Sequence, residues 1–270
     1  MSALAAGATP VRRVTQRRVA RSEWTKLRSV PSTRWALLIT LLLIIGIGIL
    51  VCVVFESRWP HLSAAERHRF NALDRSIAGV NFAQLAIGVL GVLVITAEYS
   101  TGSIRSTFAA VPKRLPVLWA KALVFGVVAF VVTLPALLIV FFVGQAILSG
   151  QHINISISHP GVVRALFGAA LFLTVMGLFG LGLGAIVRST AGGIAVLAGL
   201  VFVLPPIISL LPSSISNSVD PYLPSNAGGA VWTIHPDPNT LAPWTGFAVF
   251  CAYAAVALAV AAVLLVRRDT

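Results

Sequence analysis

The segment 98–116, EYSTGSIRSTFAAVPKRLP, carries the clearest set of side chains for contact with another protein. Its start offers hydroxyl oxygens that can cap a helix, on Ser100, Thr101 and Ser103. An apolar stripe at helical spacing follows, formed by Ile104, Phe108 and Val111 before Pro112 ends the helix. Basic side chains flank this stripe at Arg105, Lys113 and Arg114. Such a helix either docks into a groove of a partner protein or lies as a turn on the membrane surface.

An acidic residue interrupts the apolar side of a second predicted helix, 14–30, which follows a disordered basic N-terminus at 1–13. One arc of the helical wheel holds Val19, Ala20, Trp24, Leu27 and Val30, and the other side holds Arg17, Arg18, Arg21 and Arg28. This division predicts an interfacial helix with its apolar face in acyl chains and its arginines at lipid headgroups. Glu23 projects from the apolar arc, so its carboxylate needs a partner, either Lys26 or a group on another protein.

Two amide side chains, Asn81 and Gln84, lie near the outer end of a predicted membrane span. Amides buried in a span often bridge neighbouring helices by hydrogen bonds. The other interpretation is that they line a substrate path.

The sequence lacks the motifs of an enzyme. It contains no GxSxG, no HExxH and no phosphate-binding GxxxxGK[ST] loop, and His152, His159 and His235 are scattered in outer loops without metal-ligand spacing. We therefore expect no catalytic, cofactor or metal site in this chain. If the protein moves a substrate uphill, the energy must come from another chain.

Six apolar stretches determine the fold class. Hydrophobic residues make up 57% of the 270 residues and charged residues 10%, far below the roughly 25% of a soluble domain. Each stretch reaches the ~20 residues that a helix needs to cross a bilayer. The predicted spans are Trp35–Phe55, Ile77–Ala97, Leu118–Val143, Val162–Val187, Ala191–Leu211 and Trp244–Val266. We predict an all-α polytopic membrane domain at 31–270, in which Cys52 and Cys251 lie within spans and form no disulfide framework.

The charges indicate an orientation. With the N-terminus placed inside, the inner segments carry the whole net charge of +12 and the outer segments sum to zero, as the positive-inside bias predicts. We therefore expect a multi-pass protein of the bacterial plasma membrane with both termini in the cytoplasm. Anionic lipid explains the basic arm more economically than nucleic acid, which we do not expect as a partner.

Charged residues at the middle of a span are missing from this pattern. Lys121, Arg164 and Arg188 fall near span ends, where long side chains can reach the interface. Ion-coupled carriers usually need an ionisable or densely polar site at the midplane. The absence of such a site argues against a secondary transporter or channel not coupled to ATP, which is the alternative function.

Three segments that join predicted spans have compositions of their own. Glycines crowd both sides of Arg188 and predict close packing of two helices, at Gly180, Gly182, Gly184, Gly192 and Gly193. The outer loop 56–76 is either a short amphipathic helix or a solvated loop. The outer connection 212–243 contains either a re-entrant piece or an extracellular gate, and its sequence does not decide between them.

Four strings in order resemble the membrane subunits of type-2 ATP-binding-cassette (ABC) exporters, in the actinobacterial branch. They are RSEWTKLRSVPSTRW at 21–35, AEYSTGSIRSTFAAVPKR at 97–114, GLGLGAIVRSTAGG at 180–193 and the closing VRRDT. The order of these strings and the six-span layout match from about residue 20 to the C-terminus.

The resemblance implies a complex of two membrane subunits, identical or related, and two cytosolic ATPase subunits that bind ATP and Mg. It implies that 14–30 is a connecting helix with Glu23, Trp24 and Lys26 near the ATPase. It also implies that 98–114 is a coupling helix seated in a groove of the ATPase. Glu98, Tyr99 and Arg105 would then make polar contacts, with Ile104 and Phe108 as apolar anchors. The expected activity is export of an amphipathic or hydrophobic substrate such as a drug, antibiotic, peptide or lipid.

Overall fold

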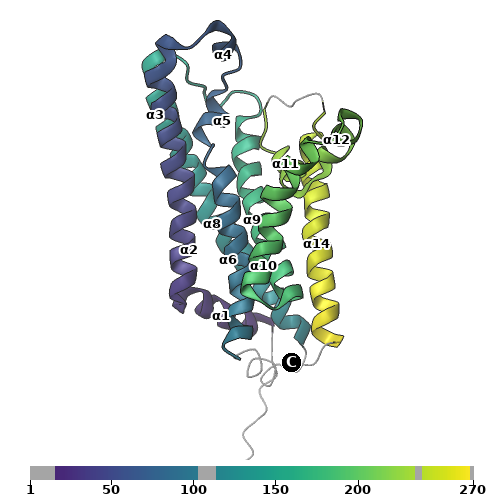
Figure 1. The fold of residues 1–270 in the computed structure, drawn as a ribbon. Coiled ribbons are helices and arrows are strands. Elements are labelled where there is room, and N and C mark those ends of the chain that lie inside the picture. Colours follow the sequence, from purple (N-terminus) through teal and green to yellow (C-terminus); the bar gives the residue numbers. More distant parts are fainter. Residues whose placement is uncertain (1–15, 103–113, 235–238, 268–270) are drawn as a thin grey trace, which may run out of the picture.

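The computed structural model describes residues 16–102, 114–234 and 239–267, and all its regular elements there are helical. Long helices run side by side, with α1 (Gln16–Ser29) across one end of the bundle and α4 (Ala64–His68) and α12 (Ser213–Val219) at the other (Figure 1). We call these the α1 end and the α4 end.

The prediction of six helices able to span a membrane is confirmed, because six helical stretches among the described residues are long and apolar enough to cross a bilayer. Their bounds are Pro31–His61, Val80–Ser100, Leu115–Gln151, Val162–Val187, Thr190–Ser209 and Pro243–Arg267. The fourth stretch has the bounds expected from the sequence. The others begin and end within a few residues of the predicted bounds, except that the first and third extend further at the α4 end.

Two of the spans are interrupted by short π-helical pieces. The first span consists of α2 (Pro31–Leu42), the π-helix η1 (Leu43–Ile47), α3 (Gly48–Arg58) and the 3-10 turn η2 (Trp59–His61). The fifth span consists of α10 (Thr190–Ala198), the π-helix η4 (Gly199–Val203) and α11 (Leu204–Ser209). Pro205 and Pro206 supply no N–H, which is consistent with the break in the regular hydrogen-bond ladder before them.

The centre of the bundle is α9 (Val162–Val187), which packs against α6 (Val80–Ser100), α8 (Arg114–Leu148) and α14 (Pro243–Arg267). Its contact with α6 is made by glycines, because a Cβ on Gly180 would overlap the backbone of Gly88 and a Cβ on Gly91 would overlap the backbone of Gly177. Small residues allow two membrane helices to approach this closely. Gly180 therefore serves close packing, but with α6 and not with the helix that follows Arg188.

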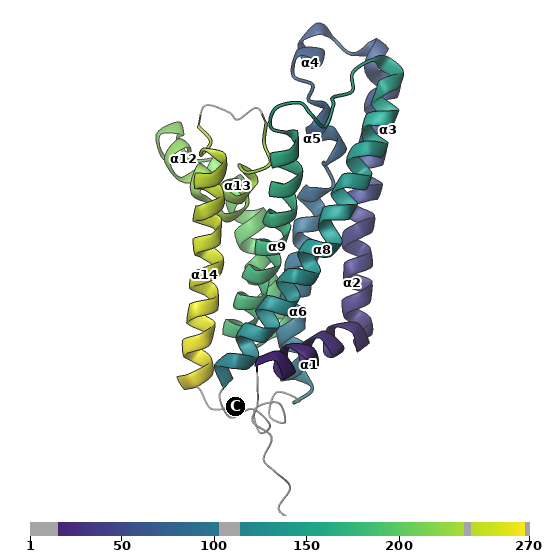
Figure 2. The same cartoon turned by 180° about the vertical axis from the view of Figure 1, so that it is seen from behind.

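The connections at the α4 end fold into short helices. The 56–76 loop contains α4 and α5 (Ala72–Ser76), and Ser63 and Glu66 form a capping box at the start of α4. The 3-10 turn η3 (Ser149–Gln151) follows α8. The connection 212–243 contains α12, the 3-10 turn η5 (Asp220–Tyr222) and α13 (Pro224–Gly229), which pack at the α4 end beside α14 (Figures 1 and 2).

Candidate functional site

Four charged side chains from three helices meet at the α1 end. Glu23 and Lys26 lie on α1, Glu98 lies in the last turn of α6, and Lys121 lies two turns into α8. Figure 2 shows α1 running across the lower ends of α6 and α8, which brings the four residues together. We call Glu23, Lys26, Glu98 and Lys121 the charged ring.

Acids and bases alternate around the ring. Lys26 Nζ is 2.8 Å from Glu23 Oε1 and 2.9 Å from Glu98 Oε1. Lys121 Nζ is 2.5 Å from Glu23 Oε2 and 2.8 Å from Glu98 Oε1. Each ammonium therefore contacts both carboxylates, and the four formal charges sum to zero.

The ring is formed inside the protein. The side chains of Glu23 and Lys121 are each 3% exposed, that of Glu98 is 11% exposed and that of Lys26 is 35% exposed. Removing one partner from a buried ion pair typically costs about 3–5 kcal/mol, because the other charge is left without compensation. The ring therefore fastens α1 to the ends of α6 and α8.

Lys26, the most exposed member, remains a cation. Its partial burial acts to lower its pKa, but hydrogen bonds to Glu23 and Glu98, together with their negative charges, outweigh this effect and raise the pKa above its ordinary value. The ammonium therefore stays charged throughout the physiological range.

The structure answers which partner Glu23 has. Lys26 is one partner, as one interpretation held, and Lys121 is a second that sequence reasoning missed. Val19 and Leu27 are buried on the same face of α1, one turn to either side, so this face turns toward the bundle and carries Glu23 with it. A lysine within an apolar stretch was the available signal, since the chain has three lysines and two of them belong to the ring.

One expectation about this end was wrong. Lys121 does not reach toward the membrane interface, because it turns inward to the carboxylates and is buried. Val19 and Leu27 of the apolar arc of α1 are buried and this helix packs on α8, while Trp24 is half exposed, so the interfacial position of α1 stays a prediction.

A small cavity of about 360 Å³ adjoins the ring. Its apolar wall includes Leu27, Leu93 and Val94, and its polar wall includes Thr33 and the ring itself. Among the described residues, no donor contacts the buried Glu98 Oε2, although Glu98 Oε1 accepts from two lysines.

The predicted docking residues are only partly placed. Arg105, Ile104 and Phe108 lie outside the described residues, so the proposed coupling helix stays a prediction. Glu98 is buried in the ring and directs its carboxylate to lysines of its own chain. Tyr99 lies beside it, with the guanidinium carbon of Arg188 5.3 Å from its ring centroid.

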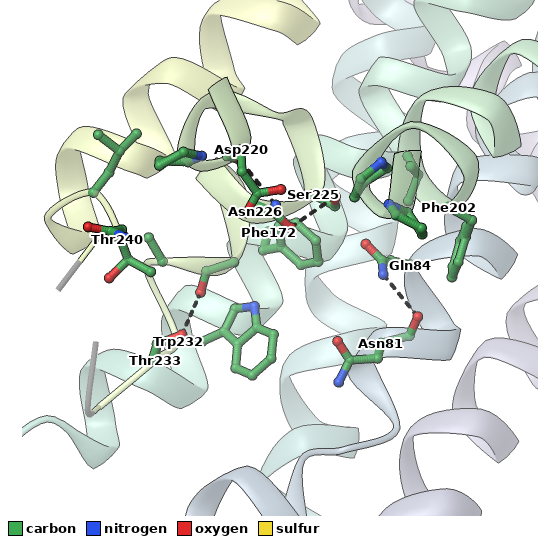
Figure 3. A pocket seen from close by; sticks show the side chains of 18 of the residues that line it. Asn81, Gln84, Phe172, Phe202, Asp220, Ser225, Asn226, Trp232, Thr233 and Thr240 are labelled. Carbon is green, nitrogen blue, oxygen red and sulfur yellow. Dashed lines mark hydrogen bonds between the residues drawn. The ribbon is translucent and has the colours of Figure 1, made fainter. Parts of the chain in front are cut away.

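The predicted amides Asn81 and Gln84 line a larger cavity of about 710 Å³ at the α4 end (Figure 3). Gln84 Nε2 donates to the carbonyl oxygen of Asn81, and Asn81 Nδ2 donates to that of Ala78, so both bonds are local along the chain. That these amides bridge neighbouring helices stays a prediction. Both residues line a space of the size that small-molecule sites have.

Arg164 supports the chain on the far side of this cavity. It is at the start of α9, and its guanidinium donates to the carbonyl oxygens of Val231 at 2.7 Å and Thr233 at 3.0 Å. These bonds hold the segment after α13, which includes Trp232, against the bundle.

No family model matches this chain, and no match was found among curated proteins. Among the described residues there is also no group of three or more His, Cys, Asp or Glu that could hold a metal ion. In the part of the chain that the structure describes, all regular elements are helical and six helices are long and apolar enough to span a membrane.

Proposed function

We propose that this chain is the membrane-spanning subunit of an ATP-driven exporter of the type-2 ABC class. ATP and Mg would bind to two copies of a separate cytosolic ATPase, and a second membrane subunit would complete the transport path. The charged ring is the observation that supports this proposal best, together with the resemblance in sequence.

Two ring members belong to or follow the predicted coupling helix, 98–114. Glu98 is its first residue and Lys121 lies seven positions after its last. Both are bonded to Glu23 or Lys26 of α1. A force applied to 103–113 by a partner would therefore reach α1, α6 and α8 together, as the drive from a separate ATPase requires.

The proposal places the α1 end in the cytoplasm, with both chain termini. Reporter fusions after residue 110 and after residue 150 test this directly. We expect cytoplasmic signals from the first and external signals from the second. The opposite pattern would put the predicted docking segment out of reach of any ATPase and would refute the proposal.

Coupling is tested by co-expressing the chain with a cytosolic P-loop ATPase, and we expect a neighbouring gene to encode one. We expect the two to copurify and the complex to hydrolyse ATP in response to transported compounds. Phe108→Ala combined with Arg105→Glu should leave membrane insertion intact and uncouple hydrolysis from export. A double variant that still binds the ATPase and exports at the wild-type rate would show that these residues do not couple the subunits.

A transport assay in vesicles distinguishes ATP-driven export from the alternative function. Uptake or efflux in vesicles that contain this chain alone, driven by a proton or sodium gradient, would identify a secondary transporter or channel. The ring is a poor ion-coupling site, because its two carboxylates are already balanced by two lysines at one end of the bundle.

A further inference from the structure

The cavity at the α4 end contains polar atoms without partners. Gln84 is 7% exposed, and its Nε2 donates to the carbonyl oxygen of Asn81, which leaves Oε1 as the free end of the amide. No described residue bonds to Gln84 Oε1 or to Trp232 Nε1, although both atoms are buried. Figure 3 shows these two side chains on the walls of the cavity, one from α6 and one from the segment after α13.

A buried acceptor without a donor costs about 1–3 kcal/mol, so it favours a ligand or water that supplies the missing hydrogen bond. The cavity is wide enough for a drug-sized molecule, since its volume of about 710 Å³ lies within the range of small-molecule sites.

The charge and the aromatic walls define what kind of molecule fits. Asp220 is the one charged residue among the described residues that line the cavity. Phe172, Phe202 and Trp232 add aromatic surface to the walls of the cavity. A carboxylate and aromatic faces both attract cations, and an acceptor such as Gln84 Oε1 takes a hydrogen bond from an ammonium group. An anion would find no described cationic side chain in this wall.

We infer that the cavity at the α4 end binds an amphipathic organic cation, with the positive group near Asp220 and the apolar body against the aromatic side chains. As a ligand site this rests on the geometry above. As the site of the exported substrate it also rests on the proposed function.

Two ions of nearly equal size and opposite charge test this inference. Binding of tetraphenylphosphonium and tetraphenylborate is measured by equilibrium dialysis with the full chain in lipid nanodiscs. We expect saturable binding of the cation, and a loss of affinity on the order of tenfold in Asp220→Asn, because the substitution removes one attractive charge while keeping the shape. Glu66→Gln is the matched control, since it removes one negative charge at the same end but outside the cavity.

The hydrogen bond is tested with a second probe. Gln84→Met removes the acceptor at similar size, so it should weaken binding of dodecylammonium by about fivefold and leave tetraphenylphosphonium, which has no N–H, unchanged. Non-saturable binding of both tetraphenyl ions, unaffected by Asp220→Asn, would show partition into lipid only and overturn the inference.

This test is independent of the exporter assay. Binding that depends on Asp220, in a chain that recruits no ATPase, would retain the site and refute ATP-driven export. Coupling to an ATPase without any effect of Asp220→Asn on cation binding would retain the exporter and refute this site.

Discussion

Lys121→Met is the sharpest test of the charged ring. The substitution keeps an unbranched apolar stem and removes one of two cations, which leaves Glu23 and Glu98 with Lys26 alone. Two unit charges 2.8 Å apart attract by about 6 kcal/mol at an effective dielectric constant of about 20. Burying the charged lysine also costs desolvation free energy. The substitution removes this cost, which offsets part of the lost attraction. We expect a net loss of about 3–5 kcal/mol in the free energy of unfolding, as is typical for one partner of a buried pair.

Equilibrium unfolding in mixed detergent and SDS micelles measures this loss, and amide hydrogen exchange locates it. Exchange should increase most in α1, because the bonds of the ring join this helix to α6 and α8. Lys26→Met is the matched control: its side chain is 35% exposed, so its pairs are partly screened and it should cost clearly less.

The double variant Glu23→Met, Lys121→Met separates charge balance from packing. It leaves one pair, Lys26 and Glu98 at 2.9 Å, with no net charge. We expect it to be more stable than Lys121→Met alone, since a buried pair replaced by apolar residues of similar volume is often neutral. A loss under about 1 kcal/mol for Lys121→Met, or strictly additive effects in the double variant, would refute the claim that the four residues act as one buried unit.

Three further predictions concern the rest of the bundle. Gly91→Ala should destabilise the protein by about 1–3 kcal/mol or more in the same unfolding assay, because its Cβ meets the backbone of Gly177, whereas Gly46→Ala, with open space around its Cβ, should be neutral or stabilising. Arg164→Gln should cost about 2 kcal/mol and raise hydrogen exchange around Trp232, since it breaks two charged hydrogen bonds; Arg164→Lys should not rescue this, because an ammonium lacks the planar fork. The pKa of Glu66 is lowered by hydrogen bonds from the Ser63 side chain and backbone. These bonds should therefore stabilise α4 fully above the ordinary carboxyl pKa, and the stabilisation should be lost as the pH falls through the lowered pKa. Ser63→Ala should return the Glu66 pKa toward its ordinary value, as measured by carboxyl NMR.

The spans could be predicted from sequence because their signal is local. A run of apolar residues long enough to cross a bilayer is visible without knowing its neighbours, and Val162–Val187 has the same bounds in the sequence and in the structure. The glycines near Arg188 were equally readable as contact points. What they contact was not, because Gly88 lies 92 positions before Gly180 and belongs to another span.

The two sites could be predicted only in part. Glu23 was recognised as a carboxylate that needs a partner, yet Lys121 is 98 positions away along the chain and reaches it only once α1 has packed across α8. The cavity at the α4 end depends on the short elements between residues 212 and 234, which have no strong periodicity to predict their fold. Gln84 and Asp220 carry no pattern that links them before the fold brings α6 and η5 to the walls of one cavity.

Under the proposed function, α6 is the element that connects the two sites. Glu98 of the charged ring and Gln84 of the cavity lie 14 residues apart on this one helix, or about 21 Å at 1.5 Å per residue. Between them, Gly88 and Gly91 hold α6 in direct backbone contact with α9, where no flexible side chain can absorb a displacement. A movement of the ring would therefore carry α6 and α9 together as one rigid body, and it would reach the cavity as a shift of Gln84 and Phe172 relative to Asp220 on η5.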